Sequence, residues 1–173
     1  MALDLSGSML AEDYEKGGER LNRLQAIKPV IQAFINDRPS DRIGIVVFSG
    51  RAYTLAPLTF DHDWLAKQLE RIRIGLIEDG TAIGDAVALA AERLRDAIER
   101  AGDLPKPKSK TIILLTDGEN NAGEVDPRTA AEICKTYGIT LSEVKNVLTM
   151  RKPRAKNTAK ASKASGGAAK KRG

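Results

Sequence analysis

Residues 111–117 read Thr-Ile-Ile-Leu-Leu-Thr-Asp, a run of four branched aliphatic residues that ends close to a carboxylate. Four consecutive Ile and Leu residues predict a strand that is covered on both faces. Along the rest of the chain, short β-branched runs alternate with longer stretches of helical spacing. This alternation is typical of an α/β sheet with helices on both faces. The sequence therefore predicts an α/β fold in which Asp117 stands at the end of a buried strand.

The flanking segments fit the same fold. Residues 43–48 form a compact apolar run, and after Ser49-Gly50 residues 51–57 alternate in part, which indicates a strand, a tight turn and a returning strand. Amphipathic spacing and capping residues predict helices over residues 20–36, 82–101 and 127–137. A further helix is predicted to begin at Asp61 or Asp63 and to end at about residue 72. Residues 139–141 can begin another strand, but the segment from Ser142 to Leu148 favours a short capped helix.

Length and composition limit the chemistry. A chain of 173 residues with 42% apolar composition makes one domain with a core. A single cysteine, Cys134, excludes a disulfide framework and a cysteine-based zinc site, and indicates a small buried residue. His62 is the only histidine, so any catalytic triad depends on it. No apolar run approaches the ~18 residues of a membrane span and no export signal is visible, so we expect a soluble, cytoplasmic chain as written.

The charge is unevenly distributed. Residues 149–173 hold nine of the 28 Lys and Arg residues and no Asp or Glu, which leaves 19 basic against 23 acidic residues before them. A solvated, disordered end is the common explanation of such a run. The alternative is a nucleic-acid-associated protein, whose binding would be non-specific and sensitive to salt because the run lacks aromatic residues for base stacking.

Oxygen-bearing side chains recur where predicted strands end and helices begin. Asp4, Ser6 and Ser8 place one carboxylate and two hydroxyls around a single turn, a pattern that is a weak signal alone because these residues are common in turns. Thr81 stands before the 82–101 helix, and Asp117 follows the 111–116 strand. Because ligands of open α/β sheets bind at the carboxyl ends of the strands, these three segments are expected to converge.

These five residues, in that order, resemble the metal-ion-dependent adhesion site of the von Willebrand factor A (VWA) family. The stretches DRIGIVVFSGRAYTLAPLTFDHD (41–63), RIGLIEDGTAIGDA (73–86) and IILLTDGENNAGEVDP (112–127) are similar to its bacterial aerotolerance, or Bat-type, branch. The resemblance covers residues 2 to about 139. It implies a Rossmann-like, mostly parallel sheet with one antiparallel edge strand.

The resemblance also implies a function. Ser6, Ser8 and Thr81 would bind Mg²⁺, or Mn²⁺, directly, whereas Asp4 and Asp117 would act largely through water. A partner's Asp or Glu would then complete the six-oxygen coordination that Mg²⁺ prefers. The implied function is a non-enzymatic protein-interaction module, and the implied partner is a MoxR-class AAA+ ATPase or an associated complex.

An enzymatic alternative has little support in the sequence. Asp85 and Glu119 are carboxylates near the metal loops, but the favoured explanations are structural: a first-turn helix acid for Asp85 and a turn side chain for Glu119. No phosphate-binding glycine motif is present, so nucleotide binding has no support either.

The chain departs from the family pattern at both ends. Only Met1, Ala2 and Leu3 precede Asp4, too few for a well-paired first strand, and the pattern is lost after Ile139. We therefore expect an incomplete VWA domain at 1–141, a short helix or linker at 142–150 and a disordered basic tail at 151–173. A fragment with a late internal start and a shifted reading frame is favoured over a short variant with a functional tail. A non-functional fragment of a Bat-type protein is an alternative to the implied binding function. The resemblance implies membrane anchors on both sides of the domain, and we expect none within the sequence as written, because it holds no apolar run of that length.

Overall fold

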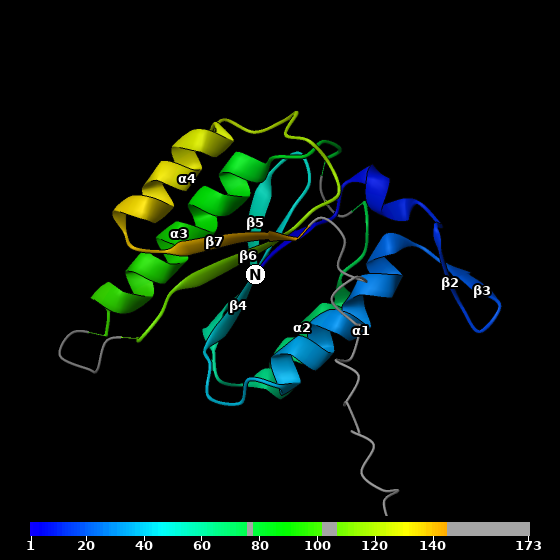
Figure 1. Cartoon of the computed structure of the whole chain (residues 1–173), viewed down its shortest axis with the longest axis horizontal. Helices are drawn as coiled ribbons and strands as arrows, with labels where there is room; N and C mark the ends of the chain where they lie inside the picture. Colours follow the sequence, from blue (N-terminus) through cyan, green and yellow to red (C-terminus); the bar gives the residue numbers. More distant parts are fainter. Residues whose placement is uncertain (76–77, 102–106, 145–173) are drawn as a thin grey trace, which may run out of the picture.

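A five-stranded sheet forms the centre of the computed structural model, which describes residues 1–75, 78–101 and 107–144 (Figure 1). β1 pairs in parallel with both β4 and β6, and β7 pairs in parallel with β6. β5 is antiparallel to β4 at one edge. This confirms the predicted mostly parallel sheet with one antiparallel edge strand. The strand order is β5 (Ala52–Thr59), β4 (Ile43–Phe48), β1 (Ala2–Asp4), β6 (Thr111–Leu115) and β7 (Thr140–Val144).

β1 is short but lies in the middle of the sheet. Ala2 is opposite Val46 on one side and Leu114 on the other, and Leu3 is likewise paired on both sides. The Val46 N–H also donates to the Met1 carbonyl at 2.8 Å. The expectation that these residues are too few for a well-paired strand is therefore wrong, because two longer neighbours supply hydrogen bonds to both edges of a very short segment.

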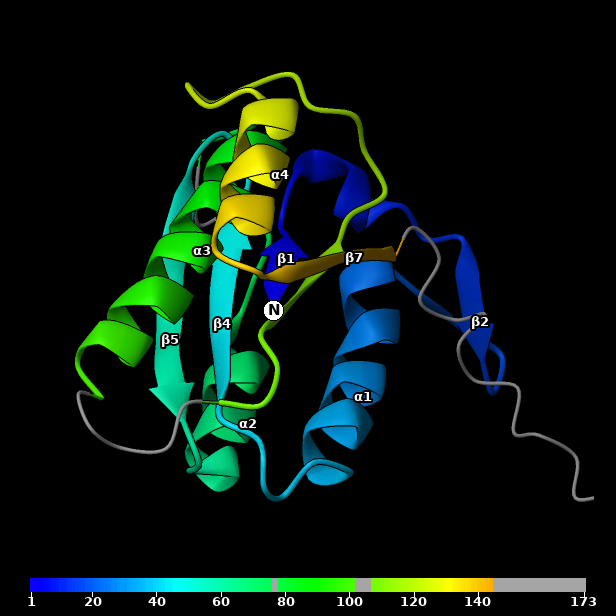
Figure 2. The same ribbon diagram turned by 60° about the vertical axis from the view of Figure 1, so that its left-hand side comes forward.

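Two helices cover each face of the sheet (Figure 2). The side chains of β4 alternate between the faces, so that Ile45 and Val47 join one core cluster whereas Val46 and Phe48 join the other. The first cluster lies under α1 and α2 and the second under α3 and α4. The predicted helices on both faces are confirmed as α1 (Arg23–Asn36), α2 (His62–Arg71), α3 (Ile83–Glu99) and α4 (Pro127–Thr136).

The segment before α1 differs from the prediction. Residues 14–21 form a hairpin of β2 (Tyr14–Lys16) and β3 (Glu19–Leu21), which protrudes beside α1 in both ribbon views (Figures 1 and 2). Gly17 and Gly18 join its strands with φ values of 64° and 86°, as a two-residue turn of this hand requires. Asn22 then caps α1, because its side chain accepts from the Gln25 N–H at 2.8 Å. The helix predicted from residue 20 therefore begins at Arg23.

The segment after α4 also differs. The short helix predicted from Ser142 is wrong for residues 142–144, which continue β7 and pair with β6. Partial alternation and the pairing available from β6 outweigh the local preference for a capped helix. The remainder of the predicted linker, residues 145–150, and the basic tail lie outside the described residues.

Two further expectations concern single residues and membrane spans. Cys134 is buried in the cluster under α3 and α4, and burial raises the pKa of its thiol. It is therefore a small core residue, as predicted. Among the helices that the structure describes, none has the length and apolar composition to cross a membrane.

Candidate metal site

The candidate ligands lie where the parallel strands end. Asp4 is the last residue of β1, Asp117 follows β6 by two residues, and Thr81 precedes α3 by two. Because β1 and β6 run in parallel, their carboxyl ends share one edge of the sheet. A 3-10 turn, η1 (Gly7–Leu10), follows β1 and includes Ser8, whose hydroxyl contacts Asp117 after β6.

Asp4 organises the first loop from inside the protein. The residue is 1% exposed, and its two oxygens accept from the Ser6 N–H at 2.8 Å and from Thr116 Oγ1 at 2.6 Å. Burial raises the pKa of the Asp4 carboxyl, and the hydrogen bonds from Ser6 and Thr116 oppose that rise. The carboxylate thus fixes the turn that follows β1 and connects it to the end of β6.

The hydroxyls of the first loop reach the second loop. Ser6 Oγ and Ser8 Oγ are 2.9 Å apart, and Ser8 Oγ donates to Asp117 Oδ1 at 2.8 Å. Residues from β1, η1 and the loop after β6 therefore form one continuous hydrogen-bonded chain. Four of the five predicted site residues belong to it.

Thr81 joins the group from the third segment. The residue is buried, and a methyl group added at Gly118 would lie 3.4 Å from Thr81 Oγ1. The Thr81 hydroxyl therefore faces the residue directly after Asp117. Among the described residues, no hydrogen bond joins this hydroxyl to the other four candidates, so its place rests on this proximity.

The residues present fit a hard divalent cation in their chemistry. Three hydroxyls and two carboxylates are oxygen donors of the kind that Mg²⁺ prefers. A side chain at position 118 would lie against the Thr81 hydroxyl, and glycine leaves that space free. Within the described ranges, no group of three or more His, Cys, Asp or Glu side chains could hold a metal. The candidate site differs from such clusters because hydroxyls form most of its donor set.

Arg23 is a neighbour that the sequence analysis missed. Its guanidinium contacts Asp117 Oδ2 through Nη1, and it also holds Asp13, with Nε 2.9 Å from Asp13 Oδ2. The hydrogen bond to Asp13 is the largest cause that raises the pKa of Arg23, and the bond to Asp117 is the next. The bond from Arg23 also lowers the pKa of Asp13. A cation of the protein itself thus stands beside the candidate metal site. The contact joins residues 94 apart in sequence, so no local pattern indicates it.

The loop after β6 is fastened to the Thr81 segment by two asparagines. Asn121 accepts from the Thr81 N–H at 2.8 Å and donates its own N–H to the Thr81 carbonyl at 3.1 Å. Asn120 Oδ1 accepts from the Ile83 N–H at 2.8 Å and the Gly84 N–H at 3.2 Å. Asn120 therefore caps α3 from another part of the chain, because Ala82 at the N-cap position has no side-chain acceptor.

Asp85 completes this attachment. Its Oδ1 accepts from the Glu124 N–H at 2.9 Å and the Val125 N–H at 2.8 Å. The role is structural, which agrees with the interpretation of Asp85 as a first-turn acid although the partners lie in another loop. Glu119 is exposed.

His62 is remote from the candidate site. It is the first residue of α2, and its Nε2 lies 2.9 Å from the Asp41 carbonyl. Thr59, which ends β5, pairs with Ile43 at the start of β4. His62 therefore lies at the amino end of β4, at the opposite edge of the sheet from Asp117.

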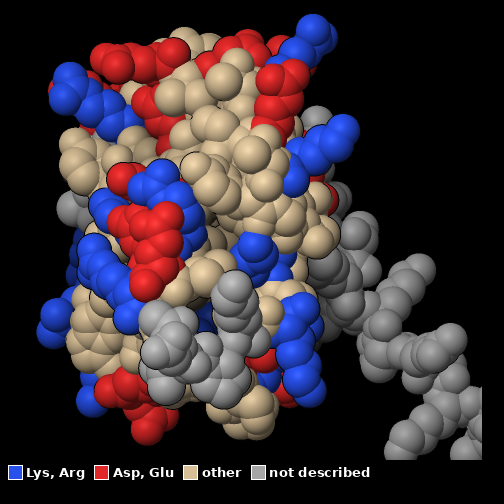
Figure 3. All heavy atoms as spheres, turned by 90° about the vertical axis from the view of Figure 1, so that its left-hand side faces the viewer, with Lys and Arg blue, Asp and Glu red and all other residues tan. Residues whose placement is uncertain are grey.

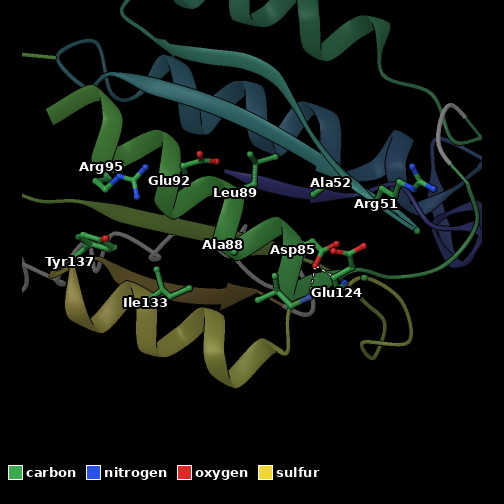
Figure 4. A pocket seen from close by; sticks show the side chains of 13 residues that line it. Arg51, Ala52, Asp85, Ala88, Leu89, Glu92, Arg95, Glu124, Ile133 and Tyr137 are labelled. Carbon is green, nitrogen blue, oxygen red and sulfur yellow. Dashed lines mark hydrogen bonds between the residues drawn. The ribbon is translucent and has the colours of Figure 1, made fainter. Parts of the chain in front are cut away.

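A groove of about 860 Å³ runs along α3 and α4 (Figure 4). Both signs of charge line it: the basic residues are Arg51 and Arg95, and the acidic residues are Asp85, Glu92 and Glu124. Figure 3 shows basic and acidic side chains interspersed over this side of the molecule. None of the five candidate ligands lines the groove, so the hollow and the candidate metal site are separate features.

Comparison with known proteins is consistent with the fold. The profile of the von Willebrand factor type A domain matches residues 1–119. A "UPF0353 protein" of Mycolicibacterium paratuberculosis is 31% identical over 151 residues, which are 83% of this chain and 43% of that protein. The chain spans less than half of the length of the first two curated relatives that it matches.

Solved structures extend the comparison. An aerotolerance-related membrane protein from Bacteroides fragilis is 34% identical with a TM-score of 0.66, over 82% of this chain and 63% of that one. Proximal thread matrix protein 1 from the mussel byssus, whose structure has a zinc-occupied MIDAS motif, has a TM-score of 0.61 over 85% of this chain and 39% of that one. At 23% identity, the second likeness shows the fold alone.

Proposed function

The chain belongs to the von Willebrand factor type A family, and on that premise we propose that it is a metal-dependent protein-binding module. Domains of this family mediate protein binding and are typically non-catalytic. The proposed ligands of the cation are Ser6, Ser8 and Thr81, supported by Asp4 and Asp117. The observation that carries the proposal is the hydrogen-bonded chain from Asp4 through Ser6 and Ser8 to Asp117.

The chemistry of this donor set favours docking over hydrolysis. When bound, Mg²⁺ would supply an open coordination position for an anionic oxygen. Ser6, Ser8 and Thr81 are neutral donors, so they would leave most of the positive charge of the ion for an incoming carboxylate. The only described imidazole, on His62, lies at the other edge of the sheet, and the proposal therefore assigns no catalytic role.

The partner is proposed by its chemistry. It would present an Asp or Glu side chain at the carboxyl edge of the sheet, where η1 and the loop after β6 surround the candidate site. A MoxR-class AAA+ ATPase complex is the partner that the family resemblance suggests. The nucleic-acid alternative stays a prediction of the sequence, because the basic tail lies outside the described residues.

Isothermal titration with Mg²⁺ and Mn²⁺ tests the proposal. Wild-type protein is expected to bind one ion, and Asp117→Ala is expected to weaken binding at least about tenfold because it removes the nearest ionised oxygen. Asp63→Ala is the matched control: Asp63 is an exposed carboxylate on α2, at the opposite edge. Equal binding by wild type and Asp117→Ala would remove Asp117 from the site.

Assays of partner and nucleic-acid binding in EDTA and at different salt concentrations separate the two functional alternatives. Metal-bridged binding of a partner should be lost on addition of EDTA. Binding to nucleic acid through the tail should ignore EDTA and fall steeply between low and physiological salt. A partner that stays bound in EDTA at physiological salt contradicts both.

A further inference from the structure

Arg23 lies at the edge of the candidate site without belonging to its donor set. It is the first residue of α1, and its position is fixed by the Asn22 cap and by a bond from its N–H to the Ala11 carbonyl at 3.2 Å. Its side chain is 30% exposed and that of Asp117 only 13%. The ion pair between them is therefore partly shielded from solvent, where charges interact more strongly than at an open surface.

The guanidinium uses different nitrogens for its two partners. Nε lies 2.9 Å and Nη2 lies 2.5 Å from Asp13 Oδ2, so one edge of the group holds Asp13. Nη1, on the other side, contacts Asp117 Oδ2. Arg23 can therefore release Asp117 and remain anchored on Asp13 through the same two nitrogens.

Both oxygens of Asp117 are engaged by the protein in this arrangement. Oδ1 accepts from Ser8 Oγ and Oδ2 from Arg23. A divalent cation held near Ser8 needs the negative charge of Asp117, and it would also repel a guanidinium in contact with that carboxylate. The cation and the Arg23 guanidinium therefore compete for the carboxylate of Asp117.

We infer that Arg23 is a built-in competitor of the divalent cation for Asp117. This inference rests on the proposed function of the site. Binding of the cation displaces Nη1 from Asp117, while Asp13 keeps the guanidinium close by. The affinity of the site for the cation is thus set partly by an arginine that is not a ligand.

The competition for Asp117 also affects the hairpin of β2 and β3. Asp13 directly precedes β2, and Arg23 follows β3 by two residues. The Asp13–Arg23 pair closes the base of the hairpin, and the contact with Asp117 fastens that base to the loop after β6. Exchange of Arg23 for a cation frees the hairpin base from this loop and leaves the hairpin itself closed.

The test compares Mg²⁺ affinity in two arginine variants by isothermal titration. Arg23→Gln should bind Mg²⁺ about threefold to tenfold more tightly than wild type, because the competing charge is gone. Arg20→Gln is the matched control: Arg20 is an exposed residue of β3 and loses the same charge without touching Asp117. An affinity of Arg23→Gln equal to or weaker than that of Arg20→Gln would overturn the inference.

A second variant has the opposite expected sign and does not depend on removing Arg23. Asp13→Asn deprives the guanidinium of its alternative partner, so Mg²⁺ binding should weaken more than in Glu12→Gln, an exposed neighbour that loses the same charge. Equal weakening in the two variants contradicts the competition. Far-UV circular dichroism of each variant in EDTA checks that the fold is retained.

The outcomes separate this inference from the proposed function. Binding by wild type without tighter binding by Arg23→Gln sinks the inference alone. Binding of Mg²⁺ by Arg23→Gln but not by wild type supports the inference. The proposed function would then require that Arg23 has left Asp117. No binding by either protein rejects both.

Discussion

Two loops meet at the candidate metal site, and they are held in place by different means. The turn after β1 has a local hydrogen bond, since Asp4 accepts from the N–H of Ser6 only two residues away, and Thr116 adds a distant contact to the same carboxylate. The loop after β6 is shaped from outside, since Asn120 and Asp85 form contacts between segments 36 to 40 residues apart. Ligand positions can thus be encoded by a short motif on one side of a site and by long-range attachment on the other.

The largest expected effect comes from closing the space through which the second loop approaches α3. A methyl group added at Gly84 would lie 1.8 Å from the Val125 carbonyl oxygen. Gly84→Ala should therefore lower the free energy of unfolding by about 3 kcal/mol or more, despite the higher helix propensity of alanine. Urea denaturation measures this.

Gly7→Ala is the matched change in the first loop. There the added methyl group meets only Asp79 Oδ1, at 3.4 Å, which is ordinary contact with a flexible side chain. The expected loss is less than about 1 kcal/mol. Similar losses in the two variants would mean that the second loop is no more tightly packed than the first.

Removal of the Asp85 carboxylate should have the next largest effect. Asp85→Ala leaves the Glu124 and Val125 N–H groups without their acceptor, so the free energy of unfolding should fall by about 2 kcal/mol. Asp63→Ala removes another acidic residue from the first turn of a helix, but this residue is exposed. The free energy of unfolding should therefore fall by only about 0.5 kcal/mol. Thermal melts of the two variants measure the difference. Equal losses would mean that Asp85 stabilises the fold only by its charge and not by its hydrogen bonds to the loop after β6.

The third comparison sets a helix cap supplied by a distant loop against a local helix cap. Asn120→Ala and Asp61→Ala each remove a helix cap, and each should lower the free energy of unfolding by about 1 kcal/mol. Only Asn120→Ala should also weaken Mg²⁺ binding, because Asn120 connects the start of α3 to the loop that carries Asp117. Equal Mg²⁺ affinity in the two variants would mean that the hydrogen bonds of Asn120 to α3 do not support the metal site.

The same division explains how far sequence reasoning succeeds. Strands β4, β5 and β6, the four helices and the order of the five oxygen donors follow from local patterns: apolar periodicity, capping residues and polar side chains at strand ends. Their gathering at one edge follows from the parallel pairing of β1 and β6. The proximity of Ser8 to Asp117 is therefore within reach of a sequence argument.

The features that were missed depend on distant partners or on competing local signals. Arg23 is an ordinary helix-start residue until folding brings Asp117 to it, and Asn120 resembles any turn asparagine until it meets the free N–H groups of α3. The Gly17-Gly18 pair is a hairpin signal that no prediction used, and the apolar spacing of α1 extended the predicted helix back to residue 20, which belongs to β3. Ser142 resembled a cap because the pairing with β6 cannot be read locally.

The central claim is that hydroxyls from separate segments of the chain bind one divalent cation. Anomalous diffraction from crystals grown with Mn²⁺ locates that ion directly. We expect one peak within bonding distance of the hydroxyl oxygens of Ser6, Ser8 and Thr81, with Arg23 Nη1 displaced from Asp117. A peak elsewhere, or none at saturating Mn²⁺, would contradict the claim.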